Sequence, residues 1–178
     1  IIGSLLVLGL PMGMYSLFLE QERNRSEKLL HNIMPKSIAD QLKKDSKLIS
    51  MDNPDISVLF ADIVSFTVMS EKISSDKLVG FLNDMFSKFD DLTESYGVEK
   101  IKTIGDSYMV VAGMPVARKD HALILFNLAK EMVKISATFN DHNGNPIKLR
   151  IGLNSGPAVS GVIGKSKFAF DVWGDTIN

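Results

Sequence analysis

The chain contains no cysteine among its 178 residues. Disulfides, zinc-thiolate sites and cysteine nucleophiles are therefore excluded. Only three histidines are present, His31, His121 and His142, and they lie too far apart to share the spacing of a metal site. An excess of charge is also lacking, because 20 basic and 21 acidic residues give a net charge of −1. Bulk electrostatics thus gives no indication of a nucleic-acid partner.

One long run without charge opens the chain, at residues 1–19. A bilayer span needs about 20 apolar residues, so this run predicts a whole or slightly clipped transmembrane helix. A signal peptide would require a basic start and a small-residue cleavage site, neither of which is visible. A buried helix of a soluble protein is the other alternative. Arg23, Arg25 and Lys28 follow directly, and basic residues flank spans on the cytoplasmic side, which predicts a membrane-anchored protein with the remainder in the cytoplasm.

The next segment, residues 20–48, combines charged residues with spaced apolar positions and predicts an amphipathic helix. Pro35 should bend this helix or begin a second one. The segment is either a solvated spacer or a dimerising helix that transmits a signal from an upstream sensor or membrane domain. The apolar spacing favours the dimerising helix, although about two heptads fall short of a firm coiled-coil prediction.

From residue 55 onward, short β-rich runs alternate with two helical patterns. The helices are predicted at residues 73–95 and 118–140. The strands are predicted at residues 56–61, 98–103, 108–112, 147–153, 158–163 and 168–173. A turn signal, Asn-Ser-Gly-Pro, separates the fourth strand from the fifth. This order predicts an α+β fold, a sandwich with a ferredoxin-like core over residues 55–178.

Two aspartates stand where neighbouring strands end. Asp62 closes an apolar strand, and Asp106 lies in the turn of a predicted hairpin. Antiparallel pairing could bring the two carboxylates together, and such hard oxygen donors suit Mg²⁺ or Mn²⁺. Aspartate is also common at strand ends and turns for purely structural reasons.

Three further residues, Arg150, Lys102 and Asp171, could bind parts of a nucleotide, although each is unremarkable alone. Arg150 lies on a strand, where an arginine is usually a surface residue but could also fork onto a triphosphate. Lys102 and Asp171 together offer a donor and an acceptor for a purine edge. The run Gly161–Ser166 looks like the end of a phosphate-binding loop, but Val159 stands where that loop requires glycine.

Five motifs in chain order resemble the class III adenylyl and guanylyl cyclase family. They are Val58–Thr67 (VLFADIVSFT), Lys100–Met109 (KIKTIGDSYM), Leu149–Gly156 (LRIGLNSG), Gly161–Gly164 (GVIG) and Phe170–Asn178 (FDVWGDTIN). The resemblance covers about residues 55–178 and reaches back to residues 30–35, similar to a helical element before many of these domains. A chance match of five ordered motifs is far less probable than a single short pattern.

The resemblance implies two catalytic domains arranged head to tail, with active sites at their interface. One partner contributes the metal ligands, here Asp62, Asp106 and the carbonyl of Ile63, for two divalent ions, Mg²⁺ or Mn²⁺. Because one chain holds the residues of both partners, a symmetric homodimer is expected to have two equivalent sites.

The same resemblance implies the residues that contact the nucleotide. They are Lys102 and Asp171 on the purine, the catalytic Asn178 that orients the ribose, Arg150 on the phosphates, and Phe66 and Thr67. The family also carries a transition-state arginine four residues after the position of Asn178, beyond the last residue given. With Ile1 as its first residue, the sequence is expected to be truncated at both ends.

The purine pair favours ATP as the substrate, with 3′,5′-cyclic AMP and pyrophosphate as products. Guanylyl cyclases resemble this pattern but place Glu at the position of Lys102 and commonly Cys at that of Asp171. Lysine can donate to an adenine ring nitrogen while aspartate accepts from the 6-amino group. A guanylyl cyclase and a non-catalytic regulatory module are the alternatives. The presence of both Asp62 and Asp106 argues against a non-catalytic module, because a degenerate domain is expected to lose a metal ligand.

Deleting residues 1–48 should abolish membrane attachment and lower dimer affinity, since this segment is predicted to supply both the span and the dimerising helix. Membrane fractionation and sedimentation of the truncated and full-length proteins would measure the two effects. Unchanged dimerisation after the deletion would contradict the dimerising role of residues 20–48.

Overall fold

The computed structural model describes residues 2–31, 33–44, 50–164 and 167–178, and for residues 2–12 it describes the backbone alone. The chain divides into two compact units, Ile1–Lys47 and Leu48–Asn178, and each is described here by itself.

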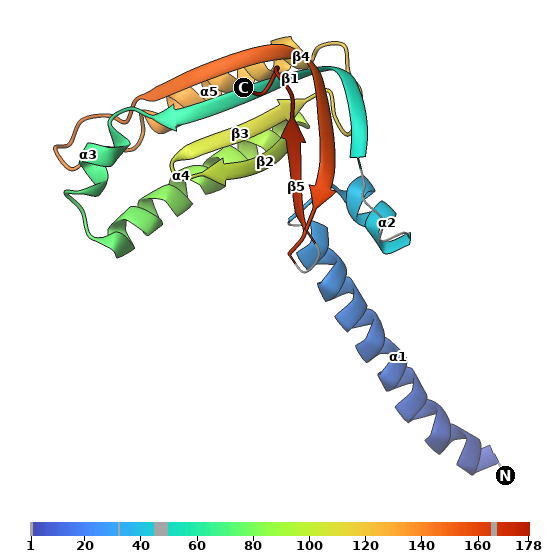
Figure 1. Cartoon of the computed structure of the whole chain (residues 1–178). Coiled ribbons are helices and arrows are strands. Elements are labelled where there is room, and N and C mark those ends of the chain that lie inside the picture. The colour runs from blue at the N-terminus through green and yellow to red at the C-terminus, as the bar shows by residue number, and fades with distance from the viewer. Residues whose placement is uncertain (1, 32, 45–49, 165–166) are drawn as a thin grey trace. The chain divides into compact units, whose positions relative to one another are not determined.

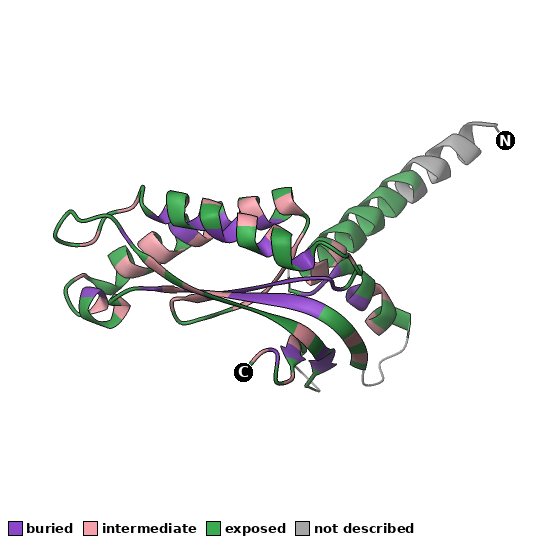
Figure 2. Cartoon of the chain, turned by 90° about the horizontal axis from the view of Figure 1, so that it is seen from above, coloured by how far each residue is buried: buried purple, intermediate pink, exposed green. Residues whose placement is uncertain are grey.

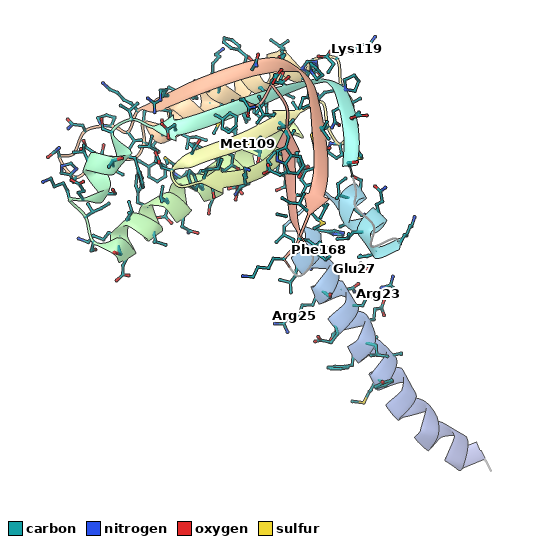
Figure 3. All side chains as sticks on the ribbon, in the orientation of Figure 1. Arg23, Arg25, Glu27, Met109, Lys119 and Phe168 are labelled. Carbon is teal, nitrogen blue, oxygen red and sulfur yellow. The ribbon has the colours of Figure 1, made fainter. Side chains whose placement is uncertain are left out.

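The first unit contains two helices, α1 (Ile2–His31) and α2 (Lys36–Lys44). The second helix begins directly after Pro35, whose carbonyl accepts the N–H groups of Ile38 and Ala39 at 3.0 Å each. This confirms the expected helix start at the proline, which is tolerated in a first turn because it needs no intrahelical donor there. Glu27 of α1 pairs with Arg23 at 3.3 Å and with Lys43 of α2 at 3.2 Å, and Figure 3 shows Arg23 and Glu27 projecting from α1.

Among the described residues, no helix is long and apolar enough to cross a membrane. Most of the predicted span, residues 1–19, falls on residues 1–12, whose side chains lie outside the described part of the chain. The transmembrane segment, the membrane anchor and the cytoplasmic location therefore stay predictions.

The second unit is built on one five-stranded sheet in the order β2-β3-β1-β4-β5, with every pairing antiparallel. Its strands are β1 (Ser50–Ile63), β2 (Glu99–Ile104), β3 (Ser107–Ala112), β4 (Leu149–Ile163) and β5 (Ala169–Trp173). Its helices are α3 (Phe66–Ser70), α4 (Ser75–Tyr96) and α5 (His121–Ser136), and Figure 1 shows α4 and α5 on one face of the sheet. The βαββαβ order and the arrangement of the first four strands confirm the α+β, ferredoxin-like prediction.

The hydrophobic core lies between the sheet and the two long helices, where Figure 2 shows the buried faces of the helices turned toward the strands. Alternate residues of β1, namely Leu59, Ala61 and Ile63, belong to this core together with Met85 and Phe89 of α4. Burying an aliphatic or aromatic side chain of this size stabilises the fold by about 1.5–3 kcal/mol. Because side chains alternate along a strand, the residues between them in β1 face away from the helices.

The structure corrects the predicted turn between residues 153 and 158. A single strand, β4, runs through Asn-Ser-Gly-Pro and pairs with β1 on both sides of it. The register shifts between Asn53 and Ile56 of β1, opposite Pro157 of β4. Proline cannot donate to a strand ladder and is tolerated at such a bulge, so the turn-forming residues produce a bend in a continuous strand instead of its end. The helix α3 was also absent from the sequence prediction.

The bend in β4 has a second effect, because it brings the two edge strands, β2 and β5, into contact although they stand at opposite ends of the strand order. Figure 1 shows β4 curving so that β5 lies beside β2. Val58, Met109 and Val111 point away from the helices and are nevertheless buried, and Met109 is labelled in Figure 3 at the middle of the sheet. The sheet therefore has a partly covered second face.

Candidate active site

The end of β1 presents Asp62 on the face of the sheet away from the helices. The strand register places Asp62 directly opposite Arg150 of β4, and the two side chains form an ion pair. The Arg150 side chain is 77% exposed, whereas that of Asp62 is 29% exposed. Since an exposed ion pair of this kind contributes at most about 1 kcal/mol, the guanidinium can exchange this partner for another anion at little cost.

The hairpin of β2 and β3 brings the second predicted carboxylate to the same place. Its two-residue turn is Gly105-Asp106, and Gly105 has a φ of 63°, in the left-handed region that such turns require. One carboxylate oxygen of Asp106 accepts the backbone N–H of Ile63 at 3.2 Å. The turn is therefore fixed against the end of β1, and the predicted meeting of Asp62 and Asp106 is observed.

Electrostatics at this end of the sheet are unfavourable for the protein alone. Burial raises the pKa of the Asp106 carboxyl, and the charge of the nearby Asp62 raises that pKa further, against the opposing effect of backbone hydrogen bonds. A divalent cation between two carboxylates would remove this repulsion, because an opposite charge favours the ionised form.

The donor set fits a hard divalent ion. Within the part of the chain that the structure describes, no group of three or more His, Cys, Asp or Glu residues is positioned to hold a metal. Two carboxylates with the adjacent Ile63 carbonyl supply a few oxygen ligands and leave positions for water or phosphate, which is the usual arrangement for Mg²⁺ in phosphate chemistry. Asp62, Asp106 and Ile63 are thus compatible with the predicted metal site.

Lys102 and Asp171 form a second ion pair, between the edge strands β2 and β5. Their side chains are 38% and 18% exposed, respectively. One carboxylate oxygen of Asp171 pairs with the lysine, and the other accepts the backbone N–H of Val172 at 2.9 Å. The bend of the sheet brings together these two residues, which are 69 positions apart. Their role in reading a purine stays a prediction.

Three other predicted residues, Phe66, Thr67 and Asn178, take no part in these two ion pairs. Phe66 and Thr67 begin α3, after Ser65, which adopts a positive φ of 61° and turns the chain sharply at the end of β1. Asn178 is exposed, and its backbone N–H binds the carbonyl of Gly174 at 3.3 Å. Among the described residues, the side chains of Thr67 and Asn178 make no hydrogen bond to either ion pair.

One supporting residue was missed from the sequence. Asn154 of β4 donates from its side chain to the carbonyl of Thr176 at 3.1 Å and so holds the segment that leads to Asn178. Its position on the exposed face of a long strand could be recognised only once β4 was known to be continuous through the predicted turn.

The comparison with protein families is decisive for identity. Residues 49–178 match the family described as the adenylate and guanylate cyclase catalytic domain. The chain belongs to this family.

Relatives of this cyclase domain carry both names. It is 48% identical over 161 residues to an adenylate cyclase of Mycobacterium tuberculosis strain H37Rv, covering 90% of this chain and 36% of that protein. It is 39% identical over 159 residues to the rat (Rattus norvegicus) guanylate cyclase soluble subunit beta-2, covering 88% of this chain and 23% of that subunit. The chain therefore spans about a third or less of the length of these curated relatives.

Solved structures that resemble this domain likewise include complexes with either nucleotide type. The cyclase domain superposes with a TM-score of 0.68 and 38% identity on the catalytic core of a rhodopsin-guanylyl cyclase with converted specificity in complex with ATPαS, covering 72% of this chain and 70% of that one. The guanylate cyclase domain of RhGC from Catenaria anguillulae, in complex with GTP, has a TM-score of 0.67 and 36% identity over 71% of this chain and 69% of that one. Family membership alone thus leaves the purine open.

Replacing Asp106 with asparagine should leave the metal-free domain at least as stable as the wild type. The pKa of this carboxyl is higher in the folded state than in the unfolded chain, where it is about 4. The free energy of unfolding therefore falls as the pH rises above about 4. At pH 7 the neutral amide removes that cost while still accepting the N–H of Ile63, so we expect a melting temperature raised by up to about 4 °C.

Stabilisation by added Mg²⁺ should be lost in the same variant, as should activity, and thermal melts with and without the ion would measure this. Asp84→Asn, on the exposed face of α4, is the matched control. A clear fall in the metal-free melting temperature, or a retained response to Mg²⁺, would contradict the assignment of Asp106.

Proposed function

We propose that this domain is an adenylyl cyclase that converts ATP to 3′,5′-cyclic AMP and pyrophosphate at the interface of a homodimer. The observation that carries the proposal is the contact between Lys102 and Asp171. Adenine presents an acceptor, a ring nitrogen, beside a donor, its 6-amino group, and this pair offers a donor beside an acceptor. Guanine presents an acceptor, O6, beside two donors, its ring N–H and 2-amino group, so the same pair would leave the 2-amino group without an acceptor.

The carboxylates of Asp62 and Asp106 support the catalytic part of the proposal, because they fit two divalent ions, Mg²⁺ or Mn²⁺. When bound, such ions lower the pKa of the ribose 3′-hydroxyl and neutralise charge on the triphosphate. In the reaction the 3′-oxygen bonds to the α-phosphorus, the bond from that phosphorus to the β-phosphate oxygen breaks, and the hydroxyl proton is released. The chain offers no strong candidate for a general base.

The remaining residues position the nucleotide. Arg150, largely exposed beside Asp62, is suited to fork onto phosphate oxygens. Phe66 and Thr67 begin a helix whose first N–H groups lack intrahelical partners, so they can face the phosphates. Asn178 is proposed to orient the ribose.

The distribution of the two sets of residues supports the proposed homodimer. The metal-binding set lies at the end of β1, and the purine-reading set lies between β2 and β5. A head-to-tail pair of identical domains would place the first set of one copy against the second set of the other and would create two equivalent sites. A guanylyl cyclase is the second candidate, because relatives with that name match this chain as well.

Attachment to a membrane is proposed through residues 1–19, with residues 20–48 as the connection to the catalytic domain. The support is the uncharged run itself and the basic residues Arg23 and Arg25 that follow it. The domain would then act in the cytoplasm and respond to a sensor elsewhere in the full-length protein.

Exchanging the purine pair should exchange the substrate. In the variant Lys102→Glu with Asp171→Cys, we expect the ratio of kcat/KM for ATP to that for GTP to fall by about 100-fold or more, since the new carboxylate accepts from guanine. Initial rates with each nucleotide would measure the ratio, with Lys72→Glu as an exposed charge control. A wild-type protein that makes cyclic GMP faster than cyclic AMP would overturn the adenylyl assignment.

Mixing two impaired variants should restore activity if each site is shared. As homodimers, the Asp62→Asn protein is expected to be inactive and the Lys102→Ala protein to keep only a low, measurable activity. A heterodimer keeps one intact site, so an equal mixture should recover about a quarter of the wild-type activity. No recovery, with heterodimers shown by differential tagging, would contradict the shared site.

A further inference from the structure

Two lysines on β2 point to opposite faces of the sheet although they are two positions apart. Lys100 stands opposite Val110 of β3, and Lys102 stands opposite Met109, so the register shifts by one residue at Ile101. Val110 belongs to the core under the helices, whereas Met109 points to the other face. In a regular strand, residues i and i+2 share one face, so this β-bulge alone separates the two lysines.

The contacts of the two lysines confirm the two directions. Lys100 donates to Asp90 of α4 at 2.6 Å, on the helical side of the sheet. Lys102 pairs with Asp171 of β5 on the opposite side. Without the extra residue, Lys102 would stand opposite Tyr108 and point toward the helices. The purine-reading position therefore exists only because the bulge exists.

Asp90 joins the strands on both sides of this bulge. Its carboxylate accepts from Lys100 of β2 and from the hydroxyl of Tyr108 of β3. Tyr108 is fully buried, and the Lys100 ammonium lies 4.9 Å from the centroid of its ring. Burial, together with Asp90, raises the pKa of the Tyr108 hydroxyl, which therefore stays protonated as a donor. A buried phenol with a charged acceptor is costly to leave unpaired, so the Tyr108–Asp90 bond is the stronger link, and the partly exposed Lys100–Asp90 pair adds a weaker one.

We propose that Asp90, Lys100 and Tyr108 form a positioning cluster for purine selection. They fix the bulge at Ile101 and thereby keep Lys102 on the face where it meets Asp171. None of the three is proposed to touch the nucleotide, and their effect passes through Lys102. The inference rests on the proposed role of Lys102 as a purine reader. Misplacing a recognition group by about 1 Å is enough to lower discrimination strongly.

A double-mutant cycle in the full-length protein tests this inference. Asp90→Ala should lower the ratio of kcat/KM for ATP to that for GTP by about tenfold, mainly through a higher KM for ATP. In a Lys102→Ala background the same change should leave the ratio unaltered, because the residue through which it acts is gone. Asp90→Asn, which keeps an acceptor for Tyr108, should recover part of the loss. Asp91→Ala, on an exposed position of the same helix, is the control and should have no effect.

Hydrogen exchange provides a second readout, with faster exchange expected in residues 99–104 of Asp90→Ala while α5 is unchanged. If Asp90→Ala fails to fold, Tyr108→Phe takes its place, because it removes only the hydroxyl and keeps the ring. A folded variant with an unchanged ratio, or an equal loss in both backgrounds, would overturn the inference. A wild-type protein without a preference for ATP would instead overturn the proposed function. That result comes from the wild-type rates alone and is independent of the Asp90 variants.

Discussion

The long antiparallel pairing of β1 with β4 is the interaction on which the rest of the catalytic domain depends. One end of this pairing sets Asp62 opposite Arg150 and receives the turn that carries Asp106. Beyond the bulge opposite Pro157, β4 continues into its pairing with β5 and so delivers Asp171 to Lys102. A single bent ribbon of backbone hydrogen bonds therefore determines the place of both groups of side chains. The helices α4 and α5 stabilise that ribbon from the face opposite the side chains of Asp62, Lys102 and Arg150.

Much of this arrangement could be predicted from the sequence. The two helical patterns and the order of strands gave the fold, and the ends of strands indicated Asp62 and Asp106. The turn at residues 154–157 was wrong because its residues are typical of turns, and nothing local reveals that β1 continues to pair beyond them. The bulge at Ile101 was likewise invisible, because period-two alternation makes Lys100 and Lys102 look equivalent. Both failures concern backbone register, which depends on partners distant in the sequence.

The fold itself is shared by relatives named for either purine, so it does not determine the substrate. In the proposed function, discrimination between the purines depends on very few side chains, among them Lys102 and Asp171, which contact each other in this chain. A few side chains can suffice because the wrong base leaves hydrogen-bonding groups unpaired in a partly enclosed site, and this lowers its binding more than the matched bonds raise that of the right base. The end proposed to bind metal could meanwhile stay the same for both nucleotides, since in the proposed site it would meet only phosphate and ribose.

The bulge in β2 also bears on how copies of this domain can associate. β2 and β5 are the outer strands of the sheet, with only six and five residues. An irregular strand that carries lysines on both faces is a poor template for a strand from another chain, because the ladder is interrupted and the charges would have to be desolvated. Association by extending the sheet from one molecule into the next is thus discouraged at β2. The homodimer proposed above would therefore associate through the broad faces of the domain, where residues of two copies could surround one nucleotide.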